Sequence, residues 1–444
     1  MIFLYKKISL NETITISLTE YNALKKRVAE LEEQIRLLKN GYHSNTGSTP
    51  PSHDIGRSNR KSLRKRSFRK KGGQLGHEGS TLEMTENPYK IIEYRPCYCK
   101  QCGEKLNVNE AIMVAHKQEI VLPPIVPQYI EHRAYSCKCP KCGFVTTSDE
   151  LPKHLKANVQ YGTEVSALLA YLSVRHYLPY NRIAELMSDC FHLHISAGTI
   201  DNMLQNLTEK AQPIYEQIRQ RIEQSPVIGG DETGIKINSK KAWLFTFQTQ
   251  ELNFLTVSLS RGYEMINNLF KNGFPVSVYV TDCLPAQLKV HAKLHQICTA
   301  HLLRELNNFI DVFKYEWSMK MKQLLQDAIE LKSQLKPADY LSPNEKVMLI
   351  QNRMVQLLQT NLSDKHKKVQ TFIKRLNKNH DAILTFLYYP KVPPDNNGSE
   401  RAIRNAKVKM KVSNQFKTLV GANRFAVLRS VIDTTIKNSH INRK

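Results

Sequence analysis

The chain has 444 residues, of which 41% are hydrophobic and 23% charged, and this length and composition predict several globular domains. Lys and Arg number 64 against 40 Asp and Glu, so the formal charge is +24 and nucleic acid is the expected partner. No apolar run approaches the roughly 18 residues of a membrane-spanning helix, so no membrane partner is expected and we expect a cytoplasmic protein.

Residues 1–41 are predicted to form a coiled-coil helix. Apolar side chains recur at alternating spacings of three and four residues, at Tyr21, Leu24, Val28, Leu31, Ile35 and Leu38. The β-branched residues at the first heptad position favour a parallel coiled coil of two helices, so we expect a homodimer or a larger assembly. Ser17 with Glu20 fits a capping box, and Gly41 marks the end of the helix. The alternative is an amphipathic helix packed on its own domain, because only about three heptads are present.

Residues 42–91 are predicted to be a flexible basic linker. Residues 42–54 have no periodicity, and nine of the fifteen residues from 57 to 71 are basic, with no acid among them. Such a segment binds the phosphates of nucleic acid whatever their base sequence, so we expect it to contact DNA. The residues expected to do so are Arg57, Arg60, Lys61, Arg64, Lys65, Arg66, Arg69, Lys70 and Lys71. The alternative is a solvated tail.

Residues 92–150 are predicted to form a zinc ribbon. Six of the nine cysteines gather there in two matching knuckles, at residues 97–102 and 137–142, and in a reducing compartment this favours a metal site over disulfides. Four thiolates satisfy a tetrahedral Zn²⁺, and a closed site of this kind is structural rather than catalytic. The expected ligands are Cys99, Cys102, Cys139 and Cys142. The sequence leaves open whether Cys97 or Cys137 replaces one of them.

Residues 151–225 follow a helical pattern. A helix over residues 182–187, a turn and a second helix capped by Ser196 are similar to a helix-turn-helix. Thr199 and Asn202 would then face a groove of DNA. The alternative is a helical hairpin that serves as a scaffold. Asp201 favours this alternative, because it puts a negative charge on the helix that would lie in the groove of DNA. The sequence favours neither interpretation.

Residues 226–304 and 390–444 are predicted to form an α/β core. Strands are expected over residues 226–237, 242–247, 252–259, 276–280 and 296–301. A helix between the third and fourth strands makes that connection a crossover, which places the fourth strand parallel to the first. Asp231 and Asp282 are therefore expected at the same end of the sheet.

Three acidic groups follow apolar or proline-rich supports and predict a divalent-metal site. Asp231 follows the apolar run Val227-Ile228 on the first strand, Asp282 follows the fourth strand, and Glu400 follows the double proline Pro393–Pro394. Mg²⁺ and Mn²⁺ prefer oxygen ligands, and carboxylates together with substrate phosphates are their usual site. Glu232 is expected to support Asp231, and Asp395 to cap the helix that carries Glu400.

Residues 305–389 are predicted to be a helical insertion between the second and third acids, because they are rich in Lys, Gln and Leu. His301 stands just before them, where a strand runs into a helix. A histidine at such a junction is more often structural than part of a site. The helix after Glu400 carries basic residues, and we expect Arg401 and Arg404 to contact DNA.

Over nearly its whole length the chain resembles the IS66 family of insertion-sequence transposases. The resemblance rests on the short zipper, the linker at 44–54, the joint at 72–79, the cysteine knuckles, Asp231-Glu232-Thr233, Cys298-x-x-His301 and Asp395-Asn396-Asn397-x-x-Glu400-Arg401. It implies a multidomain α+β protein with a ribonuclease-H-like core. It also implies that Asp231, Asp282 and Glu400 hold two Mg²⁺ or Mn²⁺ ions.

The expected function is therefore DNA transposition, in which the ends of an insertion sequence are cleaved with water and then joined to target DNA through a 3′-hydroxyl. The element's ends and the target DNA are the expected partners, with companion proteins of the same element. One alternative is a non-catalytic, zinc-containing DNA-binding protein derived from a transposase. Another is a structure-specific nuclease that stops after hydrolysis.

Overall fold

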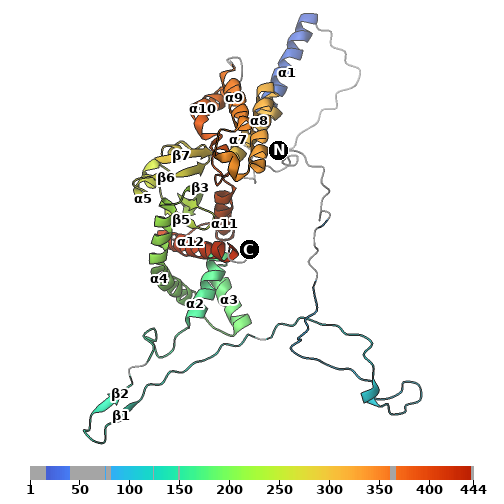
Figure 1. Ribbon diagram of the computed structural model, residues 1–444, viewed down its shortest axis with the longest axis vertical. Coiled ribbons are helices and arrows are strands. Elements are labelled where there is room, and N and C mark those ends of the chain that lie inside the picture. The colour runs from blue at the N-terminus through green and yellow to red at the C-terminus, as the bar shows by residue number, and fades with distance from the viewer. Residues whose placement is uncertain are drawn as a thin grey trace, which may run out of the picture. The chain divides into compact units, whose positions relative to one another are not determined.

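The computed structural model describes residues 17–40, 76, 82–123, 125–148, 151–360 and 367–441 (Figure 1). They form two compact units. The larger unit holds a five-stranded sheet with its helices, and the smaller one holds both cysteine knuckles and residues 185–194. The basic segment 57–71 lies outside the described residues, as do the side chains of Ile35 and Leu38.

The sheet has the strand order β5-β4-β3-β6-β7. Its strands are β3 (Val227–Ile237), β4 (Lys240–Gln248), β5 (Asn253–Ser258), β6 (Phe274–Thr281) and β7 (Ala292–Ile297). The first three form an antiparallel meander, whereas β6 runs parallel to β3 and β7 runs parallel to β6. Helix α5 (Tyr263–Leu269) connects β5 to β6, and the parallel pairing of β6 with β3 is the one expected from a crossover connection.

Aromatic rings cover one face of the sheet. Their centroids lie between 4.8 and 6.5 Å apart along a continuous series of contacts, which joins Phe247, Phe254, Phe270, Phe274 and Tyr279. Helix α4 (Ala197–Glu223) extends this layer, because its Tyr215 stacks on Phe254 at 4.6 Å and donates a hydrogen bond to the Leu255 carbonyl. Burial of these rings is the main stabilisation of this face.

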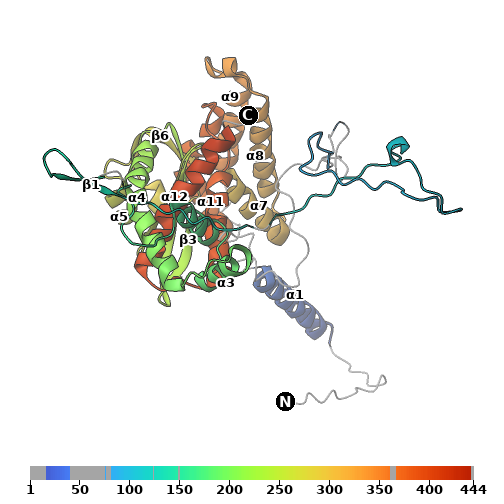
Figure 2. The same cartoon turned by 90° about the horizontal axis from the view of Figure 1, so that it is seen from below.

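Helices α7, α11 and α12 lie against the opposite face (Figure 2). Val278 and Val280 of β6 join a large apolar cluster with the helices that follow the sheet. Those helices are α7 (Thr299–Phe313), α8 (Glu316–Gln334), α9 (Glu345–Gln359) and α10 (Lys367–Lys378), and α7 begins six residues before the predicted insertion at 305–389. Short helical turns complete this region at Pro285–Leu288 (α6), Pro337–Tyr340, His380–Ala382 and Thr385–Leu387.

Helix α12 (Leu419–Ile441) joins the helices before the sheet to the sheet itself. Its Arg429 is completely buried and donates hydrogen bonds to Asp433, the Val174 carbonyl and the Tyr177 hydroxyl. Asp433 in turn accepts a hydrogen bond from Asn253 of β5. The sequence analysis did not separate this helix from α11 (Asn397–Ser413). In the described part of the chain, neither α12 nor any other helix is long and apolar enough to cross a membrane.

The helices ahead of the sheet are α2 (Thr163–Ala170), a π-helical turn (Tyr171–Arg175), α3 (Tyr180–Phe191) and α4. Helix α1 (Leu18–Asn40) begins with the predicted capping box, because Ser17 and Glu20 each bond the other's backbone N–H. The apolar heptad residues within the described side chains are exposed, at 52% for Tyr21, 56% for Leu24, 52% for Val28 and 42% for Leu31.

Gly230 of β3 is expected to tolerate no side chain. A Cβ atom there would lie 2.3 Å from the Tyr279 hydroxyl, whereas a Cβ at Gly234 on the same strand would meet nothing within 4 Å. Gly230→Ala should therefore lower the free energy of unfolding in urea by about 1–3 kcal/mol, and Gly234→Ala by much less. Tyr279→Phe combined with Gly230→Ala should restore part of the loss. Equal losses at the two glycines would contradict this packing.

Candidate active site where strands β3 and β6 stop pairing

The two aspartates predicted as metal ligands lie at the same edge of the sheet. Strands β3 and β6 are parallel, and their register pairs Gly229 with Val280. Asp231 lies two residues beyond Gly229 within β3, and Asp282 lies two residues beyond Val280, one residue after the end of β6. Because side chains two residues apart share a face of a strand, both aspartates belong to the face covered by α7 and α11.

Burial and mutual repulsion act on these aspartates. Burial is the main cause that raises the pKa of Asp231 well above its usual range, and the charge of Asp282 is the next. Glu232 and Glu400 raise the pKa of Asp231 further. Burial also raises the pKa of Asp282 to about 6, and the charge of Glu232 adds to it. The four acids therefore share one electrostatic environment with an excess of negative charge.

This donor set suits a hard divalent cation. Carboxylate oxygens are the ligands that Mg²⁺ and Mn²⁺ prefer, and a dication would favour the ionised forms that burial opposes. Asp231 and Asp282 accept hydrogen bonds from the backbone N–H groups of Glu232 (2.8 Å) and Leu284 (3.3 Å), which orient their carboxylates. Among the described residues, no three of the four acids have ligand oxygens within 4.8 Å of one another. The carboxylate oxygens of these acids are therefore farther apart than the ligand atoms around a single metal ion.

Glu400 stands on the first turn of α11 and is held by Arg304 of α7. The two guanidinium nitrogens lie 3.2 Å from Oε1, and one of them lies 3.3 Å from Oε2. About a fifth of the Glu400 side chain is exposed. The ion pair fixes the direction of the carboxylate.

A set of close contacts fixes the start of α11 on β3. The Asn396 amide donates to the Gly230 carbonyl at 2.6 Å, and the Ser399 hydroxyl donates to the Asn396 side-chain oxygen at 2.6 Å. A Cβ atom at Gly229 would lie 2.6 Å from the Ser399 hydroxyl. The absence of a side chain at Gly229 thus lets α11 approach closely enough to bring Glu400 beside Asp231.

Glu232 points to the other face and is already paired. Arg261 donates two hydrogen bonds to its Oε1, at 2.9 and 2.6 Å, and the buried Gln287 bonds Oε2. Its side chain is 2% exposed. These contacts fit the expectation that Glu232 supports Asp231 from within β3.

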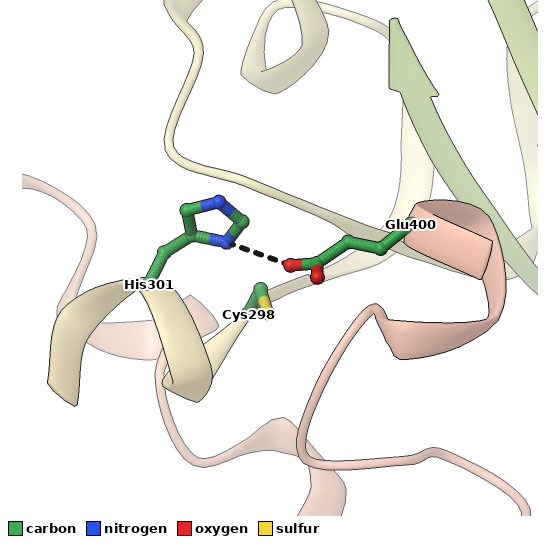
Figure 3. A group of neighbouring side chains, drawn as sticks. All are labelled: Cys298, His301 and Glu400. Atoms are coloured by element: carbon green, nitrogen blue, oxygen red, sulfur yellow. Dashed lines mark ion pairs between the residues drawn. The ribbon is translucent and has the colours of Figure 1, made fainter. Parts of the chain in front are cut away.

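His301 and Cys298 lie beside Glu400 (Figure 3). His301 Nδ1 is 3.7 Å from Glu400 Oε1, and it is buried without a hydrogen-bond partner. Burial lowers the pKa of His301 to about 4, with a further contribution from Arg304, so the ring is neutral at pH 7. Burial raises the pKa of the Cys298 thiol to about 11. The sequence analysis favoured a structural His301 and gave Cys298 no role.

The comparison with known protein families decides where the chain belongs. The family profile described as Transposase IS66 family matches residues 158–424. The chain belongs to the IS66 family of transposases. A comparison with curated proteins found no match. The matched segment contains Asp231, Asp282 and Glu400, and it lacks the cysteine knuckles and α1.

The two cysteine knuckles of this IS66 transposase have the same local structure. Gly103 and Gly143 have φ angles of +78° and +77°, and each donates its N–H to the carbonyl of the cysteine four residues earlier, Cys99 or Cys139. Hydrogen bonds from nearby backbone N–H groups, first those of Cys102 and Cys142, lower the pKa of Cys99 and Cys139. Among the described residues the six sulfurs form no group of three within 4.8 Å.

The predicted DNA-contacting residues of the IS66 transposase differ in their surroundings. Ser196 caps α4 as expected, and the Thr199 hydroxyl lies 2.9 Å from the Ser196 hydroxyl, whereas Asn202 is exposed. Asp201 pairs with Arg424 of α12. Arg401 and Arg404 are exposed on α11 next to Glu400.

Sequence reasoning missed the arginines that organise the acids. Arg304 follows His301 by three residues, so the helical period places both on one face of α7. That spacing could have indicated a shared acidic partner. Arg261 and Gln287 approach Glu232 from separate elements, and no local pattern announces them.

Asp282→Asn should stabilise the metal-free protein at pH 7. The folded pKa of Asp282 is raised from 3.8 to about 6, so its ionisation opposes folding above that range. Removing the charge should increase the free energy of unfolding by roughly 1–3 kcal/mol. The gain should disappear below about pH 4, where the acid is protonated in the folded and the unfolded chain.

Urea unfolding with a chelator present, at pH 7 and at pH 4, measures this difference. The exposed Asp189 of α3 provides the control, and Asp189→Asn should change stability by less than about 0.5 kcal/mol at either pH. A loss of stability in Asp282→Asn at pH 7 would contradict the repulsion described above.

Proposed function

We propose that this IS66 transposase cleaves DNA at the ends of its element and joins them to target DNA by phosphodiester transfer. The observation that carries the proposal is the meeting of Asp231 and Asp282 at corresponding positions of parallel strands, with Glu400 fixed beside them by α11. The excess of buried negative charge supports two Mg²⁺ or Mn²⁺ ions held by these three acids.

The topology of the sheet is evidence for the proposed ribonuclease-H-like core. Three antiparallel strands are followed by two parallel ones in the order β5-β4-β3-β6-β7, and the central strand carries the first acid. In open sheets of this kind the carboxyl ends of parallel strands are where ligands bind. The third acid comes from a helix packed on the same face, after the helical insertion.

Each part of the chain has a role in the proposed reaction. Asp231 and Asp282 bind the ions, Glu400 completes the site and Arg304 orients it. When bound, the ions supply the positive charge that activates the attacking oxygen and stabilises the leaving oxygen. Arg401 and Arg404, one and four residues beyond Glu400, are proposed to bind the backbone phosphates that flank the scissile bond, and their exposure on α11 supports this role.

The same site serves two successive attacks. Water attacks the phosphodiester first, and the P–O bond to the 3′ oxygen breaks and leaves a 3′-hydroxyl on the element. That hydroxyl then attacks a phosphorus of the target strand, and its proton leaves while the target's own 3′ oxygen departs. No protein nucleophile is needed, so acids that hold ions suffice.

Glu400→Gln and Asp231→Asn are expected to reduce cleavage and joining by about 10²-fold or more, because each removes an anionic metal ligand. Labelled oligonucleotides that carry the element's ends, incubated with Mg²⁺, report both steps. Gel-shift binding to the same DNA should persist. Glu316→Gln, at an exposed position of α8, is the matched control and should keep full activity.

The outcomes also separate the alternatives. Joining at the wild-type rate with Glu400→Gln would remove the catalytic assignment. Binding without cleavage under any divalent ion would favour a non-catalytic DNA-binding protein. Hydrolysis without strand-transfer products would identify a structure-specific nuclease.

The N-terminal parts are proposed to assemble the enzyme on DNA. The exposed heptad residues of α1 support a parallel homodimer, and the basic segment 57–71 supports binding to DNA phosphates. Thr199 and Asn202 are proposed to face the DNA. Asp201 is neutralised by Arg424, which weakens the electrostatic objection to that orientation.

We also propose that Cys99, Cys102, Cys139 and Cys142 bind a structural Zn²⁺, with Cys97 or Cys137 as the possible substitutes. The shared backbone geometry of the two knuckles supports it, because a positive-φ glycine and inward N–H groups are what a zinc knuckle requires.

Cys102→Ser combined with Cys142→Ser should abolish tightly held zinc. The intact full-length chain is expected to keep about one Zn²⁺ after dialysis against a weak chelator, as measured by atomic spectrometry. Cys190→Ser changes an exposed cysteine outside both knuckles and should leave the zinc content unaltered. Zinc retained at the wild-type level in the double variant would contradict the ligand assignment.

A further inference from the structure

Cys298, His301 and Glu400 form a cluster that the proposed magnesium site uses only in part. Cys298 is the residue before α7, His301 lies on the first turn of α7, and Glu400 lies on the first turn of α11. One ligand atom from each side chain lies within 4.8 Å of the other two. Figure 3 shows the imidazole and the carboxylate directed toward one another beside the thiol. In the described part of the chain, no other three such donors meet in this way.

The chemistry of this donor set differs from that of the aspartates. A thiolate, an imidazole nitrogen and a carboxylate oxygen suit Zn²⁺ and similar transition-metal ions, whereas Mg²⁺ prefers oxygen alone. Bonds of about 2.0–2.3 Å in a tetrahedral arrangement place ligand atoms roughly 3.3–3.8 Å apart. The 3.7 Å between His301 Nδ1 and Glu400 Oε1 already lies in that range.

The surroundings of the cluster favour a bound ion. The backbone N–H of Asn396 points at Cys298 Sγ at 3.2 Å, a contact that stabilises a metal-bound thiolate. His301 Nδ1 is buried and has no hydrogen-bond partner, so one ligand atom stands ready without losing a bond. The two negative charges of a thiolate and Glu400 match the charge of a divalent ion.

Access and competition make such a site reversible. Cys298 is completely buried, but the side chains of His301 and Glu400 are 22% and 21% exposed, so an ion can enter from their side. Arg304 bonds both oxygens of the same carboxylate, and an incoming ion has to share Glu400 with this guanidinium. The competition weakens binding relative to a closed four-thiolate site.

We propose that Cys298, His301 and Glu400 bind a zinc-like transition-metal ion, and that this ion withdraws Glu400 from the magnesium site. On binding, the Cys298 S–H bond breaks, a sulfur–metal bond forms and the proton passes to solvent. No electron is transferred. The first part stands on the cluster alone, and the second part rests on the proposed function. Zn²⁺ is then an inhibitor that acts by occupying a shared ligand.

Cobalt spectroscopy on the full-length, zinc-loaded transposase tests the first part without any activity. Co²⁺ bound to a thiolate absorbs in the near ultraviolet and, in a tetrahedral site, in the visible. Titration at neutral pH with a phosphine reductant should give both bands in the wild type. Cys298→Ser should lose the sulfur band, and His301→Gln should weaken Co²⁺ binding by about tenfold or more.

Cys190→Ser is the matched control, because it removes an exposed thiol outside the cluster and should leave the titration unchanged. Thermal melts followed by circular dichroism verify that each variant is folded. If Cys298→Ser does not fold, His301→Gln still tests the cobalt site. An unchanged cobalt spectrum in folded Cys298→Ser, or in folded His301→Gln, would overturn the site. So would the absence of a sulfur band in the wild type.

Inhibition of the Mg²⁺-dependent reaction tests the second part. Zn²⁺ should inhibit the wild type and Cys190→Ser equally, and the concentration for half inhibition should rise about tenfold or more in Cys298→Ser, relative to that variant's own uninhibited rate. Equal inhibition of the wild type, Cys190→Ser and Cys298→Ser would overturn the proposed withdrawal of Glu400. The cobalt experiment would still decide whether the ion binds. Absence of any Mg²⁺-dependent reaction would instead count against the proposed function.

Discussion

The close approach of α11 to β3 is the constraint on which the rest of the site depends. Gly229 has no side chain, so Ser399 can lie against the strand and Asn396 can donate a hydrogen bond to the Gly230 carbonyl, which docks the helix on β3. A residue with a Cβ atom at either position would push against the helix or against Tyr279. Without this contact, Glu400 would have no fixed relation to the aspartates, which come from a different part of the chain.

The acids divide into two groups with different electrostatic roles. Arginines neutralise Glu232 and Glu400, whereas Asp231 and Asp282 accept hydrogen bonds from backbone N–H groups and stay in a buried, repulsive arrangement. Burial of charge without a partner costs free energy, and proteins keep such arrangements mainly where a function uses them. The structure therefore concentrates its unfavourable electrostatics at the two positions that suit a cation.

The sequence predicted what depends on local pattern and on the rules of chain connection. The apolar runs around Val227 and Val278 revealed the strands, and the crossover rule brought Asp231 and Asp282 to one edge. The sequence could not reveal that Arg304 and Cys298 are neighbours of Glu400, because they are about a hundred residues away from it and only tertiary packing brings them together. The merging of α11 and α12 has a similar origin, since residues 414–418 form a short break without proline or glycine. Zinc binding by the knuckles stays a prediction.

Helix α12 has a consequence for how the chain folds. Its hydrogen bonds to β5 and to the helices ahead of the sheet span between 175 and 258 residues of sequence. During synthesis the edge strand β5 therefore emerges long before the side chains that satisfy its polar groups. Contacts of such high order slow folding and leave an unpaired strand edge accessible in the meantime. The nascent chain is thus most vulnerable to aggregation in the interval between translation of β5 and docking of α12.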